Sequence, residues 1–443
     1  HQNFSDMKHG LDPEYKFEVA RSIYKSMAKY IAVQHGKEYV IQPLPVSHFS
    51  TKINELGQFE LKWKPVLDSL EATAVPEGYI VYIKENEEGF DTGRFVKKTE
   101  FTLEKPKTGT LYSFKVEAVN KGGKSMPSEI LSAGLSGKGK AHVLVVNAFT
   151  RISGPSTMST GNFEGFTYFN DRGVPDKYDI SFVGDQYNFD KSSSWVTDDE
   201  PGHGASYSNY ETSVIAGNTF NYPAIHGRSI LNAGYSFVSS SVAAIMDNYE
   251  DITYYKYVDM ILGEQKATSR TRSGYDELFG RRFEAYPERL RYRLNFYVQT
   301  GGNLFISGAN VTTDVYRNPT IDSALVELSE SVLQVKHRTD HASVSGEVVT
   351  VADSIIKLPK EFRFNTFLSK DMYQVESADG IEPVSKNGSI IARYKENNIS
   401  AISSFEGYYK TLIFGFPFET IIGEKDRDAV MKAVLQFFDK PRN

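Results

Sequence analysis

The segment that most constrains the fold of this chain runs from residue 287 to 310 and reads PERLRYRLNFYVQTGGNLFISGAN. Its first half predicts an amphipathic helix, because Leu290, Leu294 and Val298 recur at helical spacing and form one apolar stripe. Two glycines suit the end of that helix, and the apolar run at 304–306 predicts a buried strand. This order of helix, glycines, strand and glycine turn is typical of a parallel α/β sheet.

Ligands of parallel sheets bind beyond the carboxyl ends of the strands. The turn over residues 308–310 is therefore a place to look for functional side chains, but it contains no nucleophile. Its one amide side chain, Asn310, can either line the edge of the sheet or satisfy the turn itself.

The length and composition of the chain set the remaining limits. A chain of 443 residues is too long for one ordinary core, so about two or three domains are expected. Its net charge of −6, with both signs mixed, gives no basic surface for nucleic acid. It has no run of about 18 apolar residues, so no membrane span is expected. Because there is no cysteine, disulfides, thiolate zinc sites and cysteine nucleophiles are excluded.

The first segment, residues 1–38, predicts one long helix. Asp12 is suited to cap it, Gly36 is suited to end it, and residues such as Ile23 and Met27 give it an apolar face. A lone amphipathic helix needs a surface to cover, and we expect the domains that follow to supply that surface.

This segment resembles the closing loop and last helix of zinc-dependent N-acetylmuramoyl-L-alanine amidases. Such amidases occur in multidomain proteins of Bacteroidetes that are often labelled xanthan lyases. In that family the zinc ligands and the catalytic glutamate precede this helix, so we expect the present chain to be a C-terminal fragment with no cofactor of its own. His1 and His9 are then expected to be loop histidines rather than metal ligands.

Residues 40–135 predict an all-β domain, because short strands alternate in polarity and are separated by turns. Phe59, Leu61 and Trp63 fall on one face of such a strand. This segment resembles a fibronectin type III domain, most clearly in the run YSFKVEAVNKGGKSMPSE, where Tyr112 would form the tyrosine corner. The resemblance implies a spacer or an interaction module, and hence a protein partner.

A linker rich in glycine and serine precedes the last segment, residues 141–443, which we expect to be an α/β domain. Its expected elements are strands at 143–147, 234–238, 258–264 and 411–419, a β-rich antiparallel extension between 333 and 408, and a final helix at 425–439.

This segment resembles the class I glutamine amidotransferase-like fold, a flavodoxin-like parallel sheet. The motifs that carry the resemblance are VDMILGEQ, YVQTGGNLFISG and LIFGFPFE. The nucleophilic cysteine of that family would lie near Ala309, and its histidine would follow the late strand, where Phe418 and Glu419 stand. Glutaminase chemistry is therefore not expected, and we assign no catalytic residue.

An insertion over about residues 150–228 is too long for a simple crossover between strands. It could form a glycan cleft from tyrosines, Trp195, asparagines and carboxylates, or it could be a structural loop. Its histidine spacing matches no zinc motif, so no metal site is predicted. The candidate ligand-binding residues are Arg151, His203, Tyr210, His226, Arg228, Glu264 and Asn310.

Three functions are compatible with these features. The first is a non-catalytic region of an exported protein, in the periplasm or at the cell surface, which binds peptidoglycan or another glycan for an upstream zinc amidase. The second is a glycan or ester hydrolase that uses strand-end residues such as Glu264 and His226, and a perturbed carboxylate pair facing a cleft would favour it. The third is a structural module for protein contacts, which an exposed apolar patch without a cleft would favour. A helical xanthan-type lyase is disfavoured because the sequence offers few long helices.

Overall fold

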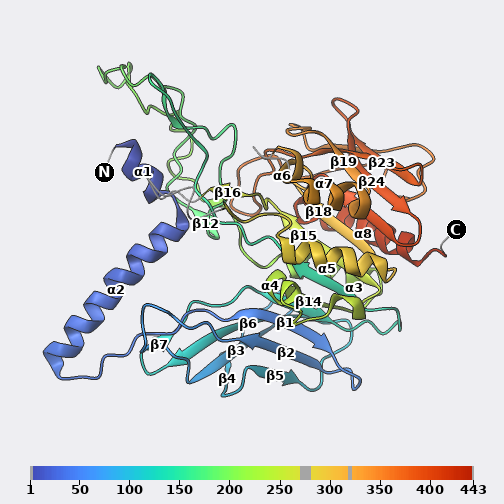
Figure 1. Ribbon diagram of the computed structural model, residues 1–443, viewed down its shortest axis with the longest axis horizontal. Helices are drawn as coiled ribbons and strands as arrows, with labels where there is room; N and C mark the ends of the chain where they lie inside the picture. The colour runs from blue at the N-terminus through green and yellow to red at the C-terminus, as the bar shows by residue number, and fades with distance from the viewer. Residues whose placement is uncertain (1–2, 270–280, 318–321, 442–443) are drawn as a thin grey trace.

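The computed structural model describes residues 3–269, 281–317 and 322–441. Figure 1 shows three parts: an N-terminal pair of helices, a β-sandwich, and a larger part in which helices flank a mixed sheet. The chain begins with helices α1 (Phe4–Gly10) and α2 (Pro13–His35). The Asp12 carboxylate caps α2 by accepting from the Glu14 amide at 3.0 Å, and Gly36 ends it with a φ of 60°.

The β-sandwich consists of two antiparallel sheets. One sheet contains β1 (Ser47–Ile53), β2 (Phe59–Lys64) and β5 (Glu100–Leu103). The other contains β3 (Gly78–Glu85), β4 (Arg94–Val96), β6 (Leu111–Asn120), β7 (Gly123–Lys124) and β8 (Leu131–Gly134). Phe59, Leu61 and Trp63 are buried between the sheets, as the alternation predicted. The Tyr112 hydroxyl accepts from the Lys107 amide at 3.0 Å, which is the tyrosine corner expected at this position.

The mixed sheet has a parallel half and an antiparallel half. In space the parallel strands follow the order β14 (Phe237–Ser241), β9 (Val143–Asn147), β15 (Tyr257–Gly263), β18 (Asn303–Gly308) and β25 (Lys410–Phe414). The antiparallel half continues with β24 (Ser400–Glu406), β23 (Gly388–Tyr394), β20 (Glu347–Thr350) and β21 (Glu361–Arg363). In chain order the parallel strands are arranged 2-1-3-4-5, so the strand order reverses between β9 and β15.

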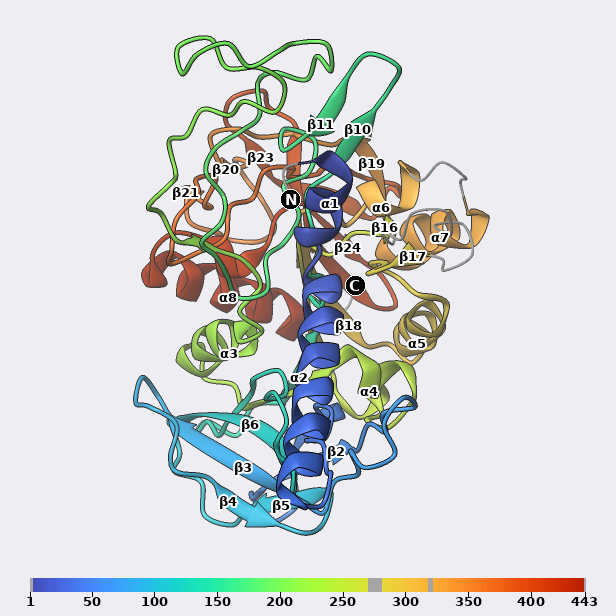
Figure 2. The ribbon, with the colours of Figure 1, turned by 90° about the vertical axis from the view of Figure 1, so that its left-hand side faces the viewer.

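Helices cover both faces of the parallel half (Figures 1 and 2). Leu144 and Val146 of β9 pack in the same core as α4 (Val242–Met246), α5 (Glu288–Gln299) and the inside of the sandwich. Val143 and Val145, which point the other way, pack with α3 (Tyr222–Asn232) and α8 (Glu424–Asp439). This alternation is the reason why the buried strand reads as a continuous apolar run.

Shorter elements complete the described residues. The two-stranded antiparallel sheets pair β10 (Thr157–Ser159) with β11 (Glu164–Phe166), β12 (Tyr178–Asp179) with β13 (Ile215–Ala216), β16 (Thr268–Ser269) with β17 (Arg281–Arg282) and β19 (Val335–Thr339) with β22 (Gly380–Pro383). The short helices are α6 (Thr313–Tyr316), α7 (Ser323–Glu327), the 3-10 helices η1 (Ile252–Tyr254) and η3 (Phe418–Thr420), and the π-helix η2 (Leu328–Leu333).

Two predicted strand boundaries are wrong. The strand expected at 234–238 begins at Phe237, because Gly234 adopts a φ of 91° and belongs to the turn after α3. The strand expected at 411–419 ends at Phe414, and residues 418–420 form the η3 helix instead. The antiparallel extension expected between 333 and 408 is present as β20 to β24.

The sandwich covers one edge of the parallel sheet. Strands β1 and β8 both pair with the edge strand β14, and a buried serine joins the two parts. The Ser239 hydroxyl accepts from the Ser132 amide and donates to the Ser132 carbonyl, both at 2.7 Å. Thr51 makes a matching pair of bonds with the backbone of Ser239 at 2.9 Å. Because an open edge strand would leave these backbone groups unpaired, the sandwich acts as a cap on the sheet.

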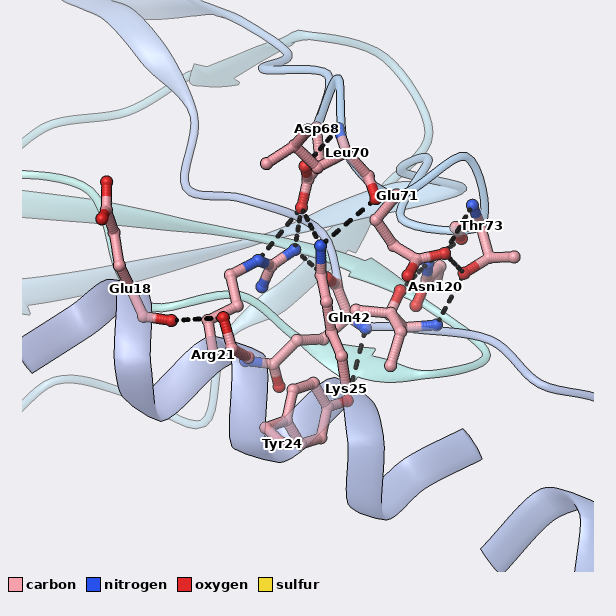
Figure 3. A network of polar contacts seen from close by, with 12 residues as sticks. Glu18, Arg21, Tyr24, Lys25, Gln42, Asp68, Leu70, Glu71, Thr73 and Asn120 are labelled. Carbon is pink, nitrogen blue, oxygen red and sulfur yellow. Dashed lines mark hydrogen bonds and ion pairs between the residues drawn. The ribbon is translucent and has the colours of Figure 1, made fainter. Parts of the chain in front are cut away.

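Helix α2 connects the sandwich to the insertion (Figure 2). Near its middle, the Arg21 guanidinium and the Lys25 ammonium both contact Asp68 of the sandwich, at 2.8 and 3.3 Å (Figure 3). At its start, Arg282 pairs with Asp12 at 3.1 Å and with Glu14. These contacts fix the helix at two points along its length.

The prediction that the apolar face of α2 covers the following domains is wrong. Ile23 and Met27 remain 55% and 59% exposed. The face that meets the sandwich is the polar one, with Arg21 and Lys25, because these side chains find a carboxylate partner there.

The junction of sandwich and sheet generates a first prediction. Replacing Ser239→Ala removes the hydroxyl that accepts from the buried Ser132 amide, and we expect a loss of about 1–3 kcal/mol in the free energy of unfolding. Urea unfolding measures it. Ser240→Ala is the matched control, because that equally buried hydroxyl bonds only to the neighbouring Ser241 carbonyl. Equal losses in both variants would contradict the assigned role of Ser239.

Candidate functional site

A cavity of about 410 Å³ lies at the carboxyl ends of β9 and β15. All three parts of the chain line it. The start of α2 contributes Phe17, the sandwich contributes Met126, and the loop before residue 376 contributes Tyr373. The insertion supplies most of the rest, and Glu264 lies at the end of the sheet. The cavity therefore occupies the point where the strand order reverses, which is where α/β sheets of this kind bind ligands.

An arginine near the start of the insertion anchors it to the sheet. Arg151 is buried, and its guanidinium bonds to both carboxylate oxygens of Asp171 at 2.8 and 2.7 Å and to the Glu264 carbonyl at 3.2 Å. Burial alone would raise the pKa of Asp171, but the charges of Arg151 and Lys266 lower it to about 2. Asn218, at the far end of the insertion, donates to the carbonyls of Phe149 and Arg151. Both ends of the insertion are thus fixed beside the cavity.

One wall of the cavity is aromatic. Tyr168 and Phe182 meet edge to face, with ring centroids 5.1 Å apart. The Arg172 guanidinium lies 5.4 Å from the Phe182 ring and is held by Asp185 at 2.8 and 3.0 Å. An aromatic surface beside fixed polar groups is a typical lining for a small-molecule site.

Two carboxyl groups line the same cavity. Glu264 is only 7% exposed, and neither carboxyl oxygen has a hydrogen-bond partner among the described residues; its Oε1 is fully buried. Burial and the nearby Glu376 raise its pKa well above the usual value. Burial and then Asp171 raise the pKa of Glu376 to about 7, although this carboxylate accepts from the Arg172 amide at 2.7 Å. The cavity therefore contains a carboxyl group whose charged form is disfavoured, next to one that titrates near neutrality.

A buried ionic network stands behind the cavity wall. His226 of α3 contacts Asp259 at 2.7 Å and Glu419 at 3.2 Å, and the Tyr373 hydroxyl donates to Glu419 at 2.8 Å. Burial alone would lower the pKa of His226, but the two carboxylates raise it to about 9, so the imidazolium form persists at neutral pH. The network positions Tyr373, which lines the cavity, while His226 itself is fully buried.

The predicted site residues do not all line the cavity. Glu264 lines the cavity, and Arg151 lies directly behind it. Tyr210 supports the wall from outside, 5.4 Å from the Phe182 ring. His203 bonds to the Glu164 carbonyl at 2.8 Å within the insertion.

The two remaining predicted residues lie elsewhere. Arg228 points to the sandwich, where it bonds to Asn86 at 3.0 Å. Asn310 is buried after β18, outside the lining of this cavity, and its amide has no partner among the described residues.

Sequence reasoning missed most of the cavity wall. Tyr373 and Glu376 lie in the β-rich extension, more than a hundred residues from Glu264, and no local motif marks them. Phe182 and Arg172 fall in the polar insertion, which has no strand or helix pattern from which the direction of a side chain could be predicted. The sequence feature that pointed to this part of the cavity wall was the long insertion before the second parallel strand.

Two features are absent from residues 3–269, 281–317 and 322–441. No group of three or more histidine, aspartate or glutamate side chains is arranged to hold a metal ion. No helix in the same residues is long and apolar enough to cross a membrane.

The buried network generates a second prediction. His226→Ala leaves Asp259 and Glu419 without their shared cation, and we expect a loss of about 3–5 kcal/mol in the free energy of unfolding at pH 6. Because the pKa of His226 is raised in the folded protein, its contribution to stability is fully present below about pH 6.5. This contribution is lost as the pH rises through about 9. Urea unfolding at pH 6 and pH 10 should therefore show a smaller difference from wild type at pH 10. A pH-independent difference would contradict an imidazolium at this position.

Comparisons with known proteins concern the sandwich. The fibronectin type III domain family matches residues 45–133. A twitchin kinase region from C. elegans is 23% identical, with 22% of this chain and 18% of that chain covered and a TM-score of 0.20. The FN1–FN3 domains of chicken CNTN1 are 19% identical, with 22% and 32% covered and a TM-score of 0.19. This chain thus spans less than a third of either structure's length, and no curated protein matches it. Residues 45–133 are a fibronectin type III domain.

Proposed function

We propose that this chain binds a saccharide, such as a peptidoglycan strand or another surface glycan, in the cavity at the carboxyl ends of β9 and β15. The observation that supports this most is the lining, which combines the aromatic wall of Tyr168 and Phe182 with the unpartnered carboxyl of Glu264. A sugar ring has apolar C–H faces that pack on aromatic rings and hydroxyl groups that bond to polar side chains. The volume of about 410 Å³ lies in the range of small-molecule sites.

The strand order supports the same proposal. We take the parallel half to be flavodoxin-like, because its order is 2-1-3-4-5, and we take its relation to the amidotransferase-like fold as part of the proposal. An exported, wall-associated setting beside a zinc amidase rests on the resemblance of the first segment alone. The fibronectin type III domain fits a role in protein interaction as well as in capping the sheet.

Binding to the cell wall gives a third prediction. The chain should pellet with purified peptidoglycan sacculi and not with a neutral polysaccharide such as starch. Phe182→Ala should weaken binding about five- to tenfold, because it removes one aromatic contact of about 1 kcal/mol. Co-sedimentation at increasing sacculus concentration measures this.

Tyr207→Ala is the matched control for that experiment. Tyr207 belongs to the same insertion and is 66% exposed, but it lies outside the lining of the cavity. No pelleting at tens of micromolar would contradict wall binding, and an equal loss in both variants would move the site away from the cavity.

The carboxyl pair favours hydrolysis as a second candidate function. Glu264, uncharged, would donate its proton to the leaving oxygen of a glycosidic or ester bond. Glu376, ionised, would take a proton from the attacking water, so that water adds across the cleaved bond. The causes of the two pKa shifts suit these roles: burial and the neighbouring Glu376 disfavour the charged form of Glu264, whereas Glu376 ionises near pH 7.

Hydrolysis gives a fourth prediction. Release of reducing ends from the polymer should increase as the pH rises through about 7, where Glu376 ionises, and decrease once Glu264 ionises. Glu376→Gln should reduce the rate about 100-fold or more and abolish the low-pH limb. A profile without that limb, or a variant with full activity, would remove Glu376 from the reaction.

A further inference from the structure

The protonation state of the Glu264 carboxyl group decides which ligand groups it can bind in the cavity. Both oxygens lack a partner among the described residues, and the side chain is more than nine-tenths buried. A buried carboxylate without a partner is costly, whereas an uncharged carboxylic acid in the same place is much less so. An uncharged acid has one O–H donor and a carbonyl acceptor on adjacent atoms.

The groups around Glu264 support the uncharged form. Asp171 and Glu376 are the acidic neighbours, and both disfavour a further negative charge. Arg151 and Lys266 are the basic neighbours, but both are already committed to Asp171, at 2.7 and 3.2 Å. The cations beside Glu264 thus have another carboxylate to neutralise.

Tyr373 is a further titratable group beside Glu264 in the lining of the cavity. Its pKa lies well above the usual value because it is buried and lies near Glu419, so it stays uncharged and donates to Glu419. It therefore offers Glu264 no charge of either sign.

We propose that Glu264 holds the ligand as an uncharged acid, which donates one hydrogen bond and accepts another. The cavity then selects an uncharged pair of adjacent donor and acceptor, such as the acetamido N–H and the neighbouring ring hydroxyl of an N-acetylated hexosamine, over a cationic group. The inference rests on the proposed function, because it names the contact through which a saccharide is chosen. The acetamido N–H donates to the carbonyl oxygen of the acid while the hydroxyl oxygen accepts from its O–H. A ligand ammonium has donors only and would require the carboxylate form.

Glutamine distinguishes the two forms, because its side chain has the shape of the uncharged acid, with a donor and an acceptor, and never ionises. The probes are an N-acetylated β-1,4-linked hexosamine oligomer and its de-acetylated, cationic counterpart. We expect the acetylated oligomer to bind wild type at least tenfold more tightly at pH 6. Glu264→Gln should bind it within about threefold of wild type, and Glu264→Ala at least tenfold more weakly.

The dependence on pH gives the sharper comparison. Wild-type affinity should fall at high pH as Glu264 ionises, and the affinity of Glu264→Gln should show no such fall. Glu376 titrates near 7, so a fall centred near 7 that persists in Glu264→Gln would belong to Glu376 and would overturn the inference. Calorimetric titration from pH 5 to pH 9, with thermal melting to check that each variant is folded, supplies these data.

The outcomes separate this inference from the proposed function. If wild type binds the oligomer but Glu264→Gln does not, or if the cationic oligomer binds more tightly, the uncharged-acid contact is wrong and saccharide binding stands. If wild type binds neither oligomer, both the inference and the proposed function are overturned.

Discussion

The buried ion pair of Arg151 and Asp171 is the contact on which the arrangement of the cavity depends. It ties the chain leaving β9 to the insertion, and through the Glu264 carbonyl it also ties it to the end of β15. A buried pair of this kind brings little net stability, because removing both ions from water costs about as much as their attraction returns. What it provides here is position, because together with Asn218 it holds the long polar insertion over the carboxyl edge of the sheet.

The other two parts of the chain complete the same cavity by different means. The fibronectin type III domain reaches it because its strands pair with β14, which fixes Met126 near the sheet edge. Helix α2 reaches it because Arg282 holds the start of the helix and Asp68 holds its middle. The cavity is thus a property of the assembly rather than of any one part. Its walls should respond to changes at the distant contacts as well as to changes in its lining.

Much of the fold could be predicted from local patterns, and the cavity could not. The alternation of Phe59, Leu61 and Trp63 predicted a sandwich strand, and the run at 143–147 predicted a buried parallel strand, because both depend on neighbours in sequence. Burial of Ile23 on α2 was predicted wrongly because the sequence shows an apolar face but not what it meets. Glu264 was found because it ends a strand, whereas Glu376 was missed because only the antiparallel extension brings it there.

Unpartnered polar groups inside a protein call for a reason, because each costs about 1–3 kcal/mol compared with a hydrogen-bonded one. Asp171 meets its requirements within the protein, with two cations and the Gly173 amide at 2.9 Å. The neighbouring carboxyl group of Glu264 has no such partner among the described residues, although Arg151 lies close enough to bond to the backbone carbonyl of Glu264. The protein thus supplies a partner for the backbone of this residue and leaves the side chain to the cavity. On the proposed function, the partner of this buried carboxyl group is one that arrives with the ligand.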